Sequence, residues 1–95
     1  MQIISIIGCL AEDCQLRKDK RGVEYIRFKV ICLDKNLSGK EVVTIYRCFT
    51  YNLQFSNLRE GEGVFVSGPY YAGEFNGNPT HDITVQNLSR YGDIK

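Results

Sequence analysis

Residues 42–51 read Val42-Val43-Thr44-Ile45-Tyr46-Arg47-Cys48-Phe49-Thr50-Tyr51. β-Branched and aromatic side chains dominate this run, which predicts a β-strand whose alternate side chains point to opposite faces. One face then carries Ile45, Arg47, Phe49 and Tyr51. A guanidinium between aromatic and apolar groups suits the stacking of unpaired bases and the binding of their phosphates. The alternative is a strand buried on both faces, with Arg47 in a salt bridge.

The preceding segment predicts a neighbouring strand of similar character. Lys20-Arg21-Gly22 is typical of a hairpin turn, and residues 23–33 follow with regular alternation. The apolar face of this strand carries Ile26, Phe28, Val30 and Cys32, and the opposite face carries Tyr25, Arg27, Lys29 and Ile31. Two adjacent strands can therefore share one outer face of aromatic and basic side chains.

The remaining segments indicate a small barrel. We expect strands at residues 2–8, 61–68 and 80–88, a loop at 34–41, and a short helix at 52–60. Asn76-Gly77 is a strong signal for a β-hairpin turn. Short strands about ten residues apart predict an all-β protein closed into a barrel.

Length and composition limit the possible classes of protein. A chain of 95 residues suffices for one domain, and its apolar (43%) and charged (24%) fractions are ordinary for a globular protein. No apolar run is long enough to span a membrane, and the N-terminus lacks the basic start of a signal peptide. We therefore expect a cytoplasmic protein without a membrane partner.

The charge is unevenly distributed although the net charge is only +1. Residues 17–29 hold six basic side chains against Asp19 and Glu24, whereas residues 57–82 hold one basic side chain against four acidic ones. This distribution is compatible with a basic groove on one side of the molecule. For Lys18, Lys20 and Arg21, a solvated hairpin tip is the alternative.

No pattern for chemistry is present. The four cysteines form no CxxC pair, and His81 is the single histidine, so neither a metal site nor a cofactor is expected. The sequence also lacks a P-loop, a GxGxxG motif and a nucleophile with a matching base, so no catalytic residue is assigned. Binding without catalysis is the expected function.

Several short motifs, in order along residues 1–91, resemble the single-stranded DNA-binding protein family of bacteria and phages. The motifs are Ile7-Gly8-Cys9-Leu10 followed by Asp13 and Arg17, Gly22, Phe28, Ile45-Tyr46-Arg47-Cys48 with Tyr51, the segment 58–68, and Phe75. The resemblance implies a five-stranded OB-fold barrel with one short helix between the third and fourth strands and a long β-hairpin. Residues 92–95 would form a short tail.

The resemblance also implies how a ligand binds. Tyr51 and Phe75 match the family's base-stacking positions, and Arg47 matches a phosphate or stacking contact. Strand alternation adds Tyr25, Arg27, Lys29 and Phe49, and the excess of basic residues at 17–29 adds Lys18, Lys20 and Arg21. The expected nucleic-acid-binding set is therefore Lys18, Lys20, Arg21, Tyr25, Arg27, Lys29, Arg47, Phe49, Tyr51 and Phe75.

Family members usually assemble as dimers or tetramers through the first strand. We accordingly expect a homodimer or homotetramer whose interface includes Ile3, Ile4, Ser5 and Ile6. The sequence departs from the family in having no tryptophan, an aliphatic Ile45 where an aromatic is common, and a helical region about one turn short. No acidic tip for recruiting repair enzymes precedes Lys95, so that role is not expected.

The leading hypothesis is therefore non-enzymatic binding of single-stranded DNA, with little sequence preference, in replication, recombination or repair. One alternative is a replication-restart factor similar to primosomal replication protein N. Another is a protein-interaction module that uses Ile45, Phe49 and Tyr51. An RNA-binding barrel is a further alternative, because base stacking does not by itself separate RNA from DNA.

Overall fold

The strand expected at residues 42–51 is β4 (Glu41–Thr50), which pairs with β3 (Glu24–Lys35) along its whole length. The computed structural model describes residues 2–91. The expected tail at residues 92–95 lies outside this range. The other elements are β1 (Gln2–Leu10), β2 (Gln15–Lys18), the 3-10 helix η1 (Leu53–Phe55), β5 (Gly63–Phe75), β6 (Asn78–Thr84) and β7 (Asn87–Arg90).

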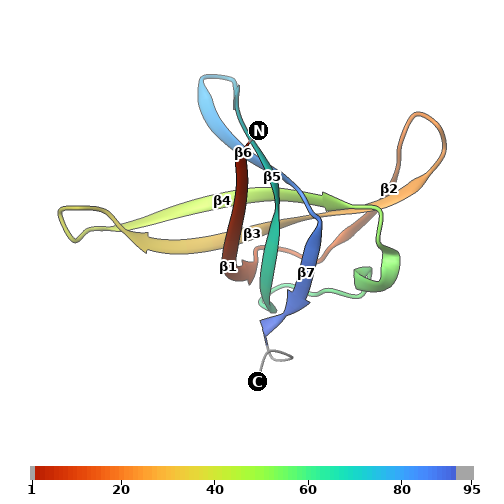
Figure 1. The fold of residues 1–95 in the computed structure, drawn as a ribbon, viewed down its shortest axis with the longest axis horizontal. Helices are drawn as coiled ribbons and strands as arrows, with labels where there is room; N and C mark the ends of the chain where they lie inside the picture. The colour runs from red at the N-terminus through yellow and green to blue at the C-terminus, as the bar shows by residue number, and fades with distance from the viewer. Residues whose placement is uncertain (1, 92–95) are drawn as a thin grey trace.

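Five strands close into a ring in the order β1-β3-β4-β6-β5, with β5 pairing back to β1 (Figure 1). All neighbours in the ring are antiparallel except β4 and β6, which are parallel. β2 pairs with β3, and β7 pairs with β5, as additions to the ring. The predicted all-β, five-stranded OB-fold barrel is confirmed.

Strand alternation places the apolar faces inside the barrel, as predicted for β3. Removing these side chains from water is the main force that holds so small a barrel closed. The buried core comprises Ile6, Leu10, Ile26, Phe28, Val30, Cys32, Cys48, Leu58, Val64, Val66 and Ile83.

The expected helix at residues 52–60 was wrong in extent, because only the three residues of η1 are helical. The Asn52 side chain accepts a hydrogen bond from the Gln54 backbone N–H and starts this turn. Two turns are too few to stabilise an α-helix without extensive packing. Here Leu58 alone is fully buried in the segment, where it contributes to the core after the chain has left the turn.

Three hairpins extend from the barrel in different directions, formed by β2–β3, β3–β4 and β5–β6 (Figure 1). The β5–β6 turn has positive φ at Asn76 (52°) and Gly77 (81°), as a two-residue type I′ turn requires, which confirms the predicted hairpin. The expected return strand at residues 80–88 is divided into β6 and β7. At this break a side chain on Gly68 would overlap the Thr84 carbonyl oxygen, so the close approach requires glycine.

Candidate nucleic-acid interface

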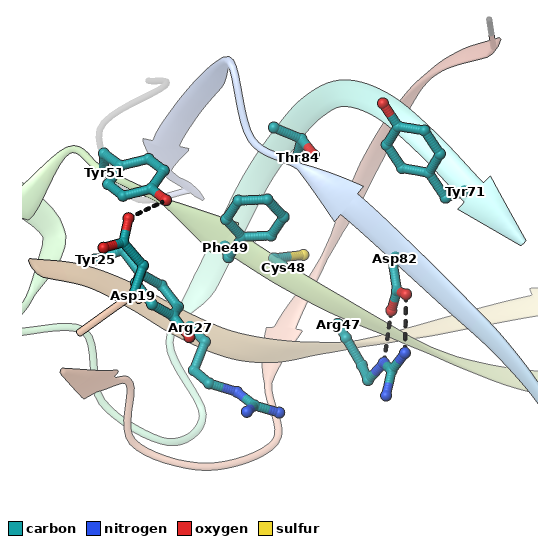
Figure 2. Close-up of a pocket in the computed structure, with 10 residues that line it drawn as sticks. All are labelled: Asp19, Tyr25, Arg27, Arg47, Cys48, Phe49, Tyr51, Tyr71, Asp82 and Thr84. Atoms are coloured by element: carbon teal, nitrogen blue, oxygen red, sulfur yellow. Dashed lines mark hydrogen bonds and ion pairs between the residues drawn. The ribbon is translucent and has the colours of Figure 1, made fainter. Parts of the chain in front are cut away.

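A groove of about 630 Å³ crosses the outer face of β3 and β4 and continues onto β5 and β6 (Figure 2). Asp19, from the loop between β2 and β3, lies on one side of the groove, and Tyr71 on β5 lies on the other. The lining residues are Asp19, Tyr25, Arg27, Arg47, Cys48, Phe49, Tyr51, Tyr71, Asp82 and Thr84.

The β3–β4 register explains why the predicted side chains meet in this groove. Arg27 lies opposite Phe49, and Lys29 lies opposite Arg47, so aromatic and basic side chains alternate across two neighbouring strands. Directly opposed side chains on one face of an antiparallel pair are close enough to interact. Five of the ten expected binding residues line the groove: Tyr25, Arg27, Arg47, Phe49 and Tyr51.

Three aromatic rings in the groove pack against one another. The ring centroids of Tyr25 and Tyr51 are 5.8 Å apart, and Phe49 meets Tyr25 at 6.2 Å and Tyr51 at 6.4 Å in edge-to-face geometry. Such contacts are favourable beyond simple burial and hold the rings in place. Tyr51 nevertheless remains 46% exposed, so its ring is both ordered and accessible.

The Tyr51 hydroxyl donates a hydrogen bond of 3.0 Å to Asp19 Oδ2, which connects the β2–β3 loop to the end of β4 (Figure 2). Asp19 also accepts hydrogen bonds from the backbone N–H groups of Arg21 and Val23 and forms an ion pair with the Arg21 side chain. Partial desolvation raises the Asp19 pKa, but the hydrogen bonds from Val23, Arg21 and Tyr51 outweigh it and lower the pKa to about 2.

The Asp19 contacts should therefore persist to unusually low pH. Because the pKa in the folded protein lies below the ordinary value of 3.8, their stabilising contribution is present above about pH 4 and is lost as the pH falls through about 2. A carbon-13 NMR titration of the Asp19 carboxyl group should give a midpoint near 2, and Tyr51→Phe should raise that midpoint. A wild-type midpoint at 3.8 would show that the contacts do not form in solution.

Arg47 and Asp82 form a bidentate ion pair inside the groove (Figure 2). Arg47 Nε lies 2.5 Å from Asp82 Oδ1, and Nη2 lies 2.8 Å from Oδ2. The parallel pairing of β4 with β6 sets the two residues side by side. The salt-bridge alternative for Arg47 is thus correct, but the buried-strand alternative is wrong, because Ile45 and Tyr51 on the same face are exposed.

The other five expected binding residues do not line the groove. Lys29 lies beside Arg47 in the register and has a long contact of 4.0 Å with Glu12. Lys18, Lys20 and Arg21 belong to the β2–β3 hairpin, where Arg21 pairs with Asp19. Phe75 is 67% exposed at the end of β5, beside the turn of the long hairpin.

Sequence reasoning missed five groove residues, namely Asp19, Cys48, Tyr71, Asp82 and Thr84. Tyr71 had a usable signal, because it lies four residues before Phe75 and so shares its face of an extended strand. Asp82 and Thr84 had no signal in the sequence, since they enter the groove only through the parallel β4–β6 pairing.

The expected oligomer interface is divided between two faces of β1. Ile3 is 66% exposed and Ser5 is also exposed, whereas Ile4 packs against the core and Ile6 belongs to it. Ile7, which was not in the expected set, is exposed on the same face as Ile3. β1 pairs with β5 from Gln2 to Cys9, but within residues 2–91 it pairs with β3 only at Cys9 and Leu10.

Other kinds of site have little support among residues 2–91. No group of three His, Cys, Asp or Glu side chains in this range could hold a metal ion. Burial raises the pKa of the Cys48 thiol to about 12, which makes it a poor nucleophile. Within the same residues, none of the helices is both long and apolar enough to cross a membrane.

Comparison with solved structures reveals a consistent group of neighbours. A small single-stranded DNA-binding protein from Streptomyces coelicolor superposes with a TM-score of 0.75 at 16% identity, covering 94% of this chain and 91% of that one. The chain has the fold of single-stranded DNA-binding proteins. A Plasmodium falciparum SSB in complex with ssDNA gives a TM-score of 0.64 at 17% identity, covering 95% and 94% of the two chains.

A mitochondrial single-stranded DNA-binding protein from S. cerevisiae gives a TM-score of 0.68 at 14% identity, covering 94% of this chain and 92% of that one. No family model and no curated protein sequence matches the chain. The resemblance found in the sequence is therefore confirmed at the level of the fold.

Proposed function

We propose that residues 1–91 act as one OB-fold domain that binds single-stranded DNA with little sequence preference and catalyses no reaction. The observation that carries this proposal is the groove itself, in which three mutually packed aromatic rings lie beside Arg27 and Arg47. Aromatic platforms stack bases of any identity, because every base has a π-face, and cations beside them hold the phosphates.

Two partly exposed rings, Tyr51 and Tyr71, line the groove, and a third, Phe75, lies farther along the same strand as Tyr71. Tyr51 at the end of β4, Tyr71 on β5 and Phe75 at the hairpin turn are 46%, 52% and 67% exposed. We assign base stacking to these three rings. Phosphate contacts are assigned to Arg27, which makes no ion pair within residues 2–91, and to Lys18, Lys20, Lys29 and Arg47 around it.

A titration with a fluorescent oligo-dT tests this function. Neutralising several phosphates releases counterions, so log Kd should change with log salt by about 0.7 per phosphate contact. Duplex DNA should bind much more weakly, because its bases are not available to stack. Affinity that is independent of salt, or equal affinity for duplex, would contradict the proposal. Oligo-rU in the same assay tests the RNA-binding alternative.

The cellular setting belongs to the same proposal. Exposed single strands arise in DNA replication, recombination and repair, and we place the protein in one of these processes in the cytoplasm. The replication-restart factor and the protein-interaction module remain alternatives. Failure to bind oligo-dT at low salt would favour the protein-interaction module.

We also propose that the chain forms a homodimer or homotetramer through β1. Support comes from the exposed Ile3 and Ile7 and from the unpaired edge that β1 presents over most of its length within residues 2–91. Such an edge is prone to pair with another strand. Sedimentation should show a species heavier than the 10.9 kDa monomer, and Ile3→Lys should shift it toward the monomer. A wild-type monomer at micromolar concentration would contradict this proposal.

A further inference from the structure

The Arg47–Asp82 pair raises a difficulty for phosphate binding, because it neutralises a central cation of the groove. Both residues line the groove, and their side chains are 43% and 35% exposed, so the pair lies where a ligand would approach. Asp82 accepts from Nε and Nη2, which together form one of the two donor edges of the guanidinium. A phosphate prefers the same kind of two-donor edge.

Two roles for Asp82 are physically possible and predict opposite effects. Asp82 could orient Arg47 so that its remaining donors face a phosphate, in which case removing the carboxylate would weaken binding. Alternatively, the carboxylate could occupy the donors that a phosphate would use and repel the phosphate by its own charge. The second role predicts that removing the carboxylate strengthens binding.

The charge balance favours the second role. Counterion release drives binding when a protein cation neutralises a phosphate, and the Arg47–Asp82 pair as a unit has no net charge to contribute. An ion pair this exposed also contributes little to stability, so exchanging its carboxylate for a phosphate costs little. The β4–β6 register also keeps the Asp82 carboxylate beside Arg47, so its negative charge lies close to any phosphate that approaches this guanidinium.

We infer that Asp82 is a resident anion of the groove, which competes with a DNA phosphate for Arg47 and so limits the affinity for single strands. This inference rests on the proposed function. In the free protein the carboxylate takes the place of a phosphate on Arg47. When a strand binds, the guanidinium exchanges one anionic partner for another, and the same exchange in reverse assists release.

The test compares Asp82→Asn with Glu74→Gln, using fluorescent oligo-dT at several salt concentrations. Both substitutions remove one negative charge from the β5–β6 hairpin, but exposed Glu74 lies on the opposite face of β5 from Tyr71. Asp82→Asn should tighten binding by about threefold to tenfold at low salt, the range for one recovered charge-assisted contact. It should also steepen the salt dependence by about 0.7, equivalent to one further phosphate contact.

Glu74→Gln should change the affinity less than twofold. Its slope of log Kd against log salt should stay near that of the wild type, and so be smaller than the slope for Asp82→Asn by about 0.7. Asp82→Ser serves as a second variant with a different side chain, and thermal melts show that each variant is folded. Weaker or unchanged binding by both folded Asp82 variants would overturn the inference, as would an equal gain from Glu74→Gln.

NMR of the Arg47 Nε–H group tests the exchange directly in the wild-type protein. Its signal should move on addition of oligo-dT to the position found in the Asp82→Asn complex. A signal that keeps its free-protein position would show that the ion pair persists and would overturn the inference. If wild-type protein binds no oligo-dT at any salt, the proposed function fails and this inference fails with it. If it binds but Asp82→Asn gives no gain, only the inference fails.

Discussion

Replacing Phe28 with Ala should lower the free energy of unfolding by about 3–5 kcal/mol, the usual cost of removing a large aromatic side chain from a packed core. Phe28 is 3% exposed and lies opposite Cys48 in the β3–β4 register, inside the barrel. Denaturant unfolding monitored by circular dichroism measures the loss. The dependence of the unfolding free energy on denaturant concentration should stay unchanged if the variant alters stability alone.

Leu33→Ala is the matched control, because Leu33 lies on the same strand but its side chain is exposed. The free energy of unfolding of Leu33→Ala should differ from that of the wild type by no more than about 0.5 kcal/mol, as for most surface substitutions. A larger loss for Leu33→Ala than for Phe28→Ala would mean that the two faces of β3 are assigned the wrong way round. The groove would then lose its structural basis.

Truncating Tyr71 or Phe75 to Ala should weaken oligo-dT binding by about 1–3 kcal/mol each, the usual cost of losing one base–aromatic stack. Both rings are more than half exposed, so the free energy of unfolding should change by no more than about 0.5 kcal/mol. Tyr51 gives a less specific test. Its ring packs on Tyr25 and Phe49 and its hydroxyl binds Asp19, so its truncation should affect stability as well.

Tyr91→Ala is the control for these two variants. Tyr91 is also exposed, but it lies next to Gly63, away from the groove, so its loss should leave binding unchanged. A similar loss of affinity in all three variants would contradict the stacking assignment. A loss of stability in the Tyr71 and Phe75 variants without a change in affinity would favour the protein-interaction alternative.

The elements that could be predicted from the sequence were those with a strong local pattern. β3 and β4 alternate regularly, and Asn76-Gly77 has the residues that a type I′ turn needs. The extent of β5 was not predictable, because Pro69 normally ends a central strand. Here Pro69 falls in the gap between Ser67, the last residue paired with β7, and Tyr70, the first paired with β6.

In the candidate site, too, residues on a strand with a regular local pattern could be predicted, whereas contacts between distant segments could not. Alternation along β3 and β4 was enough to place Tyr25, Arg27, Phe49 and Tyr51 on one surface. The partner of Arg47 was not predictable, because Asp82 is 35 residues away and joins it only when the barrel closes through a parallel pair. Local patterns thus revealed the cations and the rings, whereas the carboxylate that pairs with Arg47 comes into place only when the barrel closes.

Chemical-shift mapping with oligo-dT tests the central claim most directly, because it reports binding and its location in one experiment. Addition of oligo-dT to isotopically labelled protein should shift the signals of Tyr25, Arg27, Phe49, Tyr51 and Tyr71, which line the groove. Signals of Ile3 and Ile7 on the outer face of β1 should move little. Absence of any shift, or shifts concentrated on β1 with the groove unaffected, would contradict the claim that this groove binds single-stranded DNA.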